Sequence, residues 1–246
     1  IVPVRDGSGR IVGLVSAVPG GLLGALLASS FYDVGSFLTA WRAWWIADVA
    51  GMLIIAPLLL TPLFAPSPDA YEAEPGESPE ACALRRADQL ESILESNAGE
   101  VCALVLEPLV QCAGGMRMHH PAYLRRAREL CDAHGVHLIA DEIAVGFGRT
   151  GTLFACEQAG ITPDFLCLSK GLTGGFLPMS AVLTTNDVYE AFLDRDSRER
   201  AFLHSHSYTG NPLGCAAALA SLSIFEHEPV LQRNGAGRRH TLVANV

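Results

Sequence analysis

Two different patterns of hydrophobic and polar positions meet near residue 64 of this chain. Before that point, residues 11–30 carry no charged side chain and residues 44–64 carry only Asp48. A helix of roughly 20 apolar residues spans a bilayer, so both stretches are long enough to do so. The tryptophans lie beside the second stretch, as interfacial aromatics do: Trp41, Trp44 and Trp45. We expect residues 1–63 to be apolar helices, with membrane contact through residues 11–64; helices buried in a soluble core are the alternative.

Beyond residue 64, short apolar runs alternate with amphipathic stretches. The predicted strands are residues 101–107, 136–141, 164–169 and 179–184, and the predicted helices are residues 83–97, 121–134, 186–193 and 212–225. Short apolar strands separated by helices predict an α/β fold, with a mostly parallel sheet and helices on both faces. Residues 66–82 are rich in proline and acid, which by itself predicts a flexible linker.

The charge of the chain follows the same division. Residues 1–66 contain three Arg and three Asp, so the whole net charge of −9 belongs to the remainder. An acidic chain of this kind is a poor partner for nucleic acid, and we expect none. The seven cysteines include no CxxC pair, which argues against a disulfide framework and favours a reducing, cytoplasmic compartment for residues 64–234.

Lys170 is the single lysine of a chain that contains sixteen arginines. Arginine replaces lysine wherever a surface cation is needed, but it cannot attack a carbonyl to form a Schiff base because guanidinium stays protonated. A retained lysine between an apolar run and a Gly-rich turn therefore indicates amine chemistry. The alternative is a stray lysine left on a solvated surface by an Arg-rich composition.

Asp141 ends the predicted strand 136–141, and Lys170 follows the predicted strand 164–169. Ligands of open α/β sheets bind beyond the carboxyl ends of the strands. An amine and a carboxylate at neighbouring strand ends form the minimal pyridoxal-phosphate site, in which the carboxylate keeps the pyridine nitrogen protonated. Taken alone, Asp141 is equally explained as a helix N-cap or a turn residue.

Four motifs occur in a characteristic order and spacing: residues 107–115, 141–151, 168–175 and 204–212. They resemble the class III aminotransferases of fold type I, and the resemblance runs from about Phe64 to Asn234, leaving residues 235–246 as a tail. Ala144 and the stretch 116–121 are most similar to the branch that transfers an amino group from S-adenosylmethionine to 8-amino-7-oxononanoate in biotin biosynthesis.

The resemblance implies a role for each matching residue. Lys170 forms the Schiff base with pyridoxal phosphate, Asp141 pairs with the pyridinium, and Ile143 packs on the ring. His206 and Ser207 match the loop that binds cofactor phosphate across a homodimer interface, and Ser205 matches a glycine whose backbone meets substrate. His204 and His206 also have the spacing of a metal pair, but without a third ligand we expect no metal.

The resemblance also has limits. The family's N-terminal portion, with its phosphate-binding loop, and its C-terminal small domain have no match here, so we expect impaired turnover. Residues 44–60 weakly resemble the last helix of a bacterial membrane-associated sensor domain. A non-catalytic, membrane-tethered module, or a sensor fragment joined to an aminotransferase remnant, is therefore the alternative to an aminotransferase that makes 7,8-diaminononanoate.

Overall fold

The computed structural model describes residues 2–5, 11–15, 62–193 and 208–241 of the 246-residue chain. These residues belong to two compact units. The first contains strands β1 (Val2–Arg5) and β2 (Ile11–Val15), which pair antiparallel. The second contains every other helix and strand described below.

The β1–β2 pair corrects part of the expectation for the N-terminal segment. A membrane helix beginning at Ile11 was expected, but Ile11–Val15 is the strand β2. Branching at Cβ in Ile11, Val12 and Val15 favours extended backbone over helix, which explains the difference. Residues 16–61, which hold most of the expected membrane segment, lie outside the described residues. No helix in the described ranges is long and apolar enough to cross a membrane.

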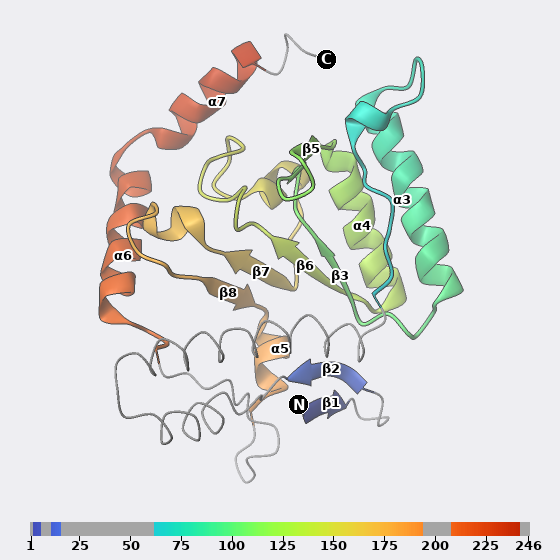
Figure 1. The fold of residues 1–246 in the computed structure, drawn as a ribbon, viewed down its shortest axis with the longest axis horizontal. Helices are drawn as coiled ribbons and strands as arrows, with labels where there is room; N and C mark the ends of the chain where they lie inside the picture. Colours follow the sequence, from blue (N-terminus) through green and yellow to red (C-terminus); the bar gives the residue numbers. More distant parts are fainter. Residues whose placement is uncertain (1, 6–10, 16–61, 194–207, 242–246) are drawn as a thin grey trace, which may run out of the picture. The chain divides into compact units, whose positions relative to one another are not determined.

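A four-stranded sheet forms the centre of the second unit, in the order β3–β6–β7–β8 (Figure 1). Its strands are β3 (Ala103–Leu106), β6 (His137–Asp141), β7 (Phe165–Leu168) and β8 (Ala181–Thr184). The first three run parallel and β8 pairs antiparallel with β7. The predicted α/β fold with a mostly parallel sheet is therefore confirmed. A separate hairpin joins β4 (Val110–Gln111) to β5 (Arg117–Met118).

The three long helices begin in the same way, with a proline in the first turn and a side-chain cap before it. They are α3 (Pro79–Ser96), α4 (Pro121–His134) and α6 (Pro212–His227), capped by Ser78, His120 and Asn211. Proline is favoured at this position because its fixed φ suits a helix and its missing N–H would lack a partner there. This signal moves the start of α3 to Pro79 from the expected residue 83.

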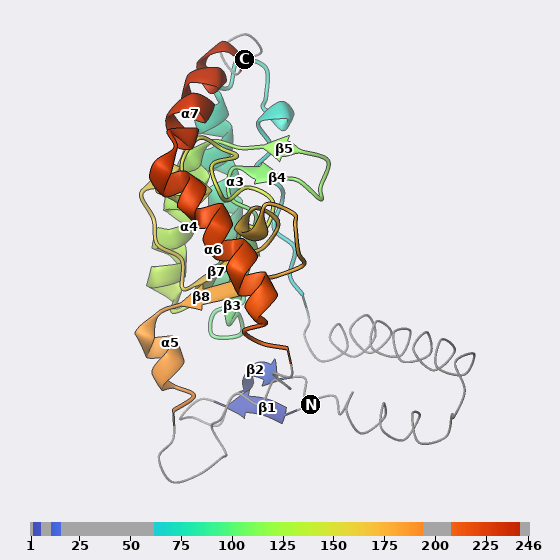
Figure 2. The ribbon, with the colours of Figure 1, turned by 90° about the vertical axis from the view of Figure 1, so that its left-hand side faces the viewer.

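Shorter helices complete the second unit. They are η1 (Ala70–Glu72), η2 (Ala155–Ala159), η3 (Lys170–Thr173), α5 (Asn186–Glu190) and α7 (Val230–Thr241). Helix α6 contacts η3, and α6 and α7 follow one another along the edge of the unit (Figures 1 and 2).

Helices α3, α4 and α6 pack against the same face of the sheet. Cross-strand register places six residues on that face: Leu104, Leu106, Leu138, Ala140, Leu166 and Leu168. Helices α3 and α4 share a buried cluster with Leu138, and α6 shares another with Leu168. On the opposite face, Val105 and Val182 are 63% and 60% exposed. In the described part of the chain, the expected helices therefore cover one face of the sheet. The buried residues of α3, α4 and α6 all pack on that face.

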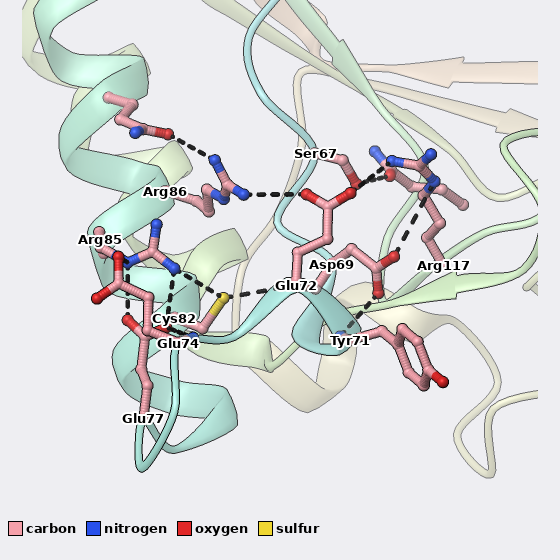
Figure 3. A network of polar contacts seen from close by, with 12 residues as sticks. Ser67, Asp69, Tyr71, Glu72, Glu74, Glu77, Cys82, Arg85, Arg86 and Arg117 are labelled. Carbon is pink, nitrogen blue, oxygen red and sulfur yellow. Dashed lines mark hydrogen bonds and ion pairs between the residues drawn. The ribbon is translucent and has the colours of Figure 1, made fainter.

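Residues 66–82, expected to be a flexible linker, are instead fixed by polar contacts (Figure 3). Asp69 caps η1 by accepting a hydrogen bond from the Tyr71 N–H at 3.1 Å. Glu72 pairs with Arg86 at 3.0 Å and with Arg117 at 3.5 Å. The sequence pattern missed this structure because each partner of Glu72 lies far along the chain.

Candidate active site

Lys170 stands at the turn between strand β7 and helix η3. β7 ends at Leu168, and the Ser169 hydroxyl donates a hydrogen bond to the Met179 carbonyl at 2.7 Å. The φ angle of Lys170 is +39°, in the left-handed region that a residue with a Cβ rarely adopts. Such a conformation costs on the order of 1–3 kcal/mol and persists only where the surroundings hold it, which is typical of functional turns. The Lys170 side chain is exposed.

Asp141 is the last residue of β6 and is in register with Cys167 of β7. Since β6 and β7 are parallel neighbours, the carboxyl ends of both strands open onto one edge of the sheet. The structure therefore brings Asp141 and Lys170 to the same edge, as the sequence predicted. Glu107 follows β3, the next parallel strand, so three adjacent strand ends carry an acid, an acid and an amine.

The carboxylate of Asp141 is half-buried and has two different oxygens. Oδ1 accepts a hydrogen bond from the Ile143 N–H at 2.9 Å, which is the turn role weighed as an alternative. Within the described ranges no donor reaches Oδ2, and no carboxylate pairs with the Lys170 ammonium. The turn contact therefore uses one oxygen and orients the other, so the structural role and a ligand-binding role are compatible.

Glu142 was missed by the sequence analysis and is the most deeply buried acid of this region, with 0% of its surface exposed. Its carboxylate accepts hydrogen bonds from the N–H groups of Ala155 and Cys156, at 2.7 and 2.8 Å. Burial raises the pKa of Glu142, and these two amide contacts oppose the rise. Glu142 thereby closes the loop 143–154. Strand alternation could have predicted this burial, because it places residue 142 on the same face of the sheet as the buried Leu138 and Ala140.

Glu107 organises the other motif at this edge. Its Oε2 accepts a hydrogen bond from the Cys112 N–H at 2.9 Å, and its carbonyl lies 3.2 Å from Nε2 of His119. Burial lowers the pKa of His119, whose ring also packs edge-on against Tyr123 at 5.6 Å. These contacts fix residues 107–119 as a closed loop beside the strand ends.

The remaining predicted site residues, Ser205, His206 and Ser207, lie outside the described residues, as does His204. The roles assigned to them in phosphate, substrate or metal binding therefore stay predictions. The described chain resumes at Tyr208, and Asn211 then caps α6 by accepting from the Leu213 N–H at 3.0 Å. In the described ranges no three His, Cys, Asp or Glu side chains are grouped to hold a metal ion.

The donor set at this edge fits a cofactor that has an aldehyde and a basic ring nitrogen. Lys170 offers a primary amine, the one side chain that condenses with an aldehyde, and Asp141 offers the free Oδ2 oxygen for a protonated nitrogen. Among the described residues, neither group has an ion-pair partner, so both could contact a ligand.

Comparison with known proteins gives the family. Residues 54–242 match the family Aminotransferase class-III, and the chain belongs to that family. The match begins at residue 54, before the point near residue 64 where the hydrophobic pattern changes.

Two curated relatives are named adenosylmethionine-8-amino-7-oxononanoate aminotransferase. The protein of Geobacter sulfurreducens is 51% identical over 72% of this chain and 40% of its own length. That of Nitratidesulfovibrio vulgaris is 50% identical over 73% of this chain and 33% of its own length. The chain thus spans about a third to two fifths of the length of these relatives.

Solved structures agree with the sequence relatives. The adenosylmethionine-8-amino-7-oxononanoate aminotransferase of Methanocaldococcus jannaschii is 38% identical, with a TM-score of 0.63, over 74% of this chain and 40% of that one. An amine transaminase from an uncultivated Pseudomonas species, solved in its PLP-bound form, is 38% identical with a TM-score of 0.60. The matched region covers 65% of this chain and 36% of the amine transaminase.

Proposed function

We propose that this chain acts in pyridoxal-phosphate-dependent amino transfer, from S-adenosylmethionine to 8-amino-7-oxononanoate, giving 7,8-diaminononanoate for biotin biosynthesis. The observation that carries the proposal is the meeting of Lys170 and Asp141 at adjacent parallel strand ends. The substrates follow from the names of relatives about 50% identical to the chain.

Pyridoxal phosphate supplies an aldehyde that condenses with amines and a ring that takes up electrons when a substrate Cα–H bond breaks. Lys170 is the residue that would hold it covalently, through Nζ. As a free amine beside a bound substrate, Lys170 would take a proton from the substrate carbon and return it. Arginine cannot do either step, since it stays protonated.

Asp141 would hold a proton on the ring nitrogen through Oδ2, the oxygen left available by the Ile143 contact. A fixed negative charge at that position favours the protonated ring and thus stabilises electron flow toward it. Glu142 supports this role indirectly, because its two amide hydrogen bonds close the loop that follows Asp141.

The phosphate and substrate ends of the site are assigned by family resemblance. Ser207 and His206 would contact cofactor phosphate, with Ser207 reaching the cofactor of a partner subunit in a homodimer, and Ser205 would meet substrate. The seven cysteines are free thiols, which suits a reducing compartment such as the cytoplasm.

A chimeric enzyme tests the function and its substrates together. Residues 65–241 would replace the matching stretch of the Geobacter sulfurreducens relative, and formation of 7,8-diaminononanoate would be measured. We expect the chimera to turn over within about tenfold of that relative. Lys170→Arg should lower the turnover of the chimera by at least about 10³-fold.

The matched control is Arg149→Lys, an exchange in the opposite direction at an exposed position of the same edge loop. A folded chimera that transfers amino groups to other keto acceptors but not to 8-amino-7-oxononanoate would overturn the substrate assignment. A folded chimera without any amino transfer would overturn the function.

A further inference from the structure

Gly171, the residue after Lys170, lies unusually close to Phe147 in the loop that follows Asp141. A Cβ placed on Gly171 would be 2.7 Å from Cβ of Phe147 and 2.8 Å from its Cδ2. Real Cβ atoms do not approach other heavy atoms within 3.0 Å. The φ angle of Gly171 is outside the left-handed region, so glycine is needed here for space and not for backbone conformation.

Phe147 has little freedom to move away. Its side chain is 9% exposed, and its ring packs edge-on against Phe154 at 5.8 Å and tilted against Phe225 at 6.4 Å. It shares a buried cluster with Leu168, at the end of β7, and with Leu172 of η3. A buried aromatic held by two others resists displacement because protein interiors are close-packed.

Two helices also make hydrogen bonds to this region. The Ser221 hydroxyl of α6 donates a hydrogen bond to the Gly171 carbonyl at 3.0 Å. The Asn234 side chain of α7 donates to the Gly148 carbonyl at 2.9 Å. The turn after Lys170 and the loop after Asp141 are thus each tied to the C-terminal helices, and they touch each other at Phe147 and Gly171.

We propose that Phe147 is a positioning residue that couples the loop of Asp141 to the turn of Lys170. The contact with Gly171 supports the left-handed backbone of Lys170, and thereby sets where Nζ lies relative to the Asp141 carboxylate. This inference rests on the proposed function, because it concerns the geometry in which Lys170 meets pyridoxal phosphate.

The test is the rate at which borohydride traps pyridoxal phosphate on Lys170 in the 246-residue chain. Acylation of the same lysine by acetic anhydride reports its accessibility and serves as the reference. We expect Gly171→Ala to slow trapping about tenfold while acylation changes less than about twofold, because the lysine stays exposed but is misdirected. A general loss of structure would instead change both rates.

A double-substitution cycle identifies Phe147 as the partner. Phe147→Ala or Phe147→Leu alone should slow trapping about threefold. Added to Gly171→Ala, either should restore part of the lost rate, since the new methyl group then has room. Circular dichroism shows which variants fold. If Phe147→Ala does not fold, Phe147→Leu is used instead, because leucine keeps most of the buried volume.

The matched controls are Gly235→Ala, where a Cβ meets nothing within 4 Å, and Phe176→Ala, whose side chain is 88% exposed. Both should trap at the unsubstituted rate. Unchanged trapping in Gly171→Ala, or independent effects of the two substitutions, would overturn the coupling alone. Failure of the unsubstituted chain to trap at Lys170 would overturn this inference together with the proposed function.

Discussion

The two halves of the second unit differ in how completely they are closed. In the half built from α3, α4, β3 and β6, the core leucines are almost fully covered: Leu90 at 2% exposed, Leu130 at 1% and Leu138 at 0%. In the half built from β7, β8, η3 and α6, large apolar side chains remain open: Phe176 at 88%, Leu213 at 69% and Leu219 at 68%. Asp141 belongs to the closed half and Lys170 to the open half.

Among the described residues, ion pairs lie mainly around α3 and α4. Arg85–Glu77 at 2.8 Å and Arg126–Glu91 at 2.7 Å belong to the closed half, and Arg128–Asp164 at 2.8 Å ties α4 to the residue before β7. Farther along the chain, Arg233 of α7 pairs with Glu228 at 2.7 Å. Large exposed apolar patches mark interaction sites. The closed half leaves Val105 63% exposed on the other face of the sheet, so its closed core lies on one face only. The exposed side chains of the open half are the ones that we expect the proposed homodimer to cover.

The largest expected effect concerns the acid that the closed half presents. Asp141→Asn keeps the size of the side chain and an oxygen for the Ile143 contact, but removes the charge that would hold a ring proton. We expect amino transfer in the chimera to fall by roughly 10²–10⁴, or about 3–5.5 kcal/mol at 1.36 kcal/mol per decade. Turnover within a factor of three of the parent would leave Asp141 as a turn residue alone.

Two leucine substitutions test whether the halves differ in stability. Leu138→Ala, at 0% exposed, should lower the free energy of unfolding by about 2–5 kcal/mol, since it removes buried methyl groups and leaves a cavity. Leu219→Ala, at 68% exposed, should change it by less than about 0.5 kcal/mol. Urea unfolding measures both, and equal losses would contradict the division into closed and open halves.

Helix caps give a smaller contrast. Ser78 caps α3 in the closed half by accepting from the Ala81 N–H at 3.1 Å, and Asn211 caps α6 by accepting from the Leu213 N–H at 3.0 Å. Ser78→Ala should cost about 1 kcal/mol of unfolding free energy. Asn211→Ala should cost no more than this, because α6 buries little of its own surface. A greater loss from Asn211→Ala would show that α6 is the more firmly packed helix.

The smallest expected effect is a pH dependence at the edge of the closed half. Hydrogen bonds from Arg85 lower the pKa of Glu77 to about 2. A carboxyl whose pKa is lower in the folded state stabilises the fold above its unfolded pKa, and this stability is lost as pH falls toward 2. The urea midpoint of unfolding should therefore change less between about pH 4.5 and 2 in Glu77→Gln than in the parent. An unchanged acid limb in this variant would show that the pair contributes nothing.

Sequence patterns predicted the elements whose ends carry strong local signals. The range predicted for α4 matches the structure because Pro121 starts the helix and Gly135, at φ +65°, ends it. Two predicted strands began two residues early, at residues 101 and 179 instead of Ala103 and Ala181, and the other two began one residue early, at 136 and 164. Hydrophobicity continues past the point where cross-strand hydrogen bonds stop, so composition alone overestimates strand length.

The candidate site was predictable only as far as its chemistry lies in single residues. Lys170 and Asp141 were predicted because the amine follows one apolar strand and the acid ends another. The supporting contacts were not, since Glu142 bonds to Ala155 across a loop and Phe147 meets Gly171 through a turn. Such contacts depend on loop backbone, including the φ of +56° at Phe147, which sequence patterns do not specify.

In this proposal, the open half presents the amine that holds the cofactor. The direct measurement is to add pyridoxal phosphate to the 246-residue chain, reduce with borohydride, digest the protein, and locate the added mass by peptide mapping. We expect the label on the peptide that contains Lys170, and its loss in Lys170→Arg. Label confined to the α-amino group, or equal labelling of the Lys170→Arg variant, would show that Lys170 does not hold the cofactor.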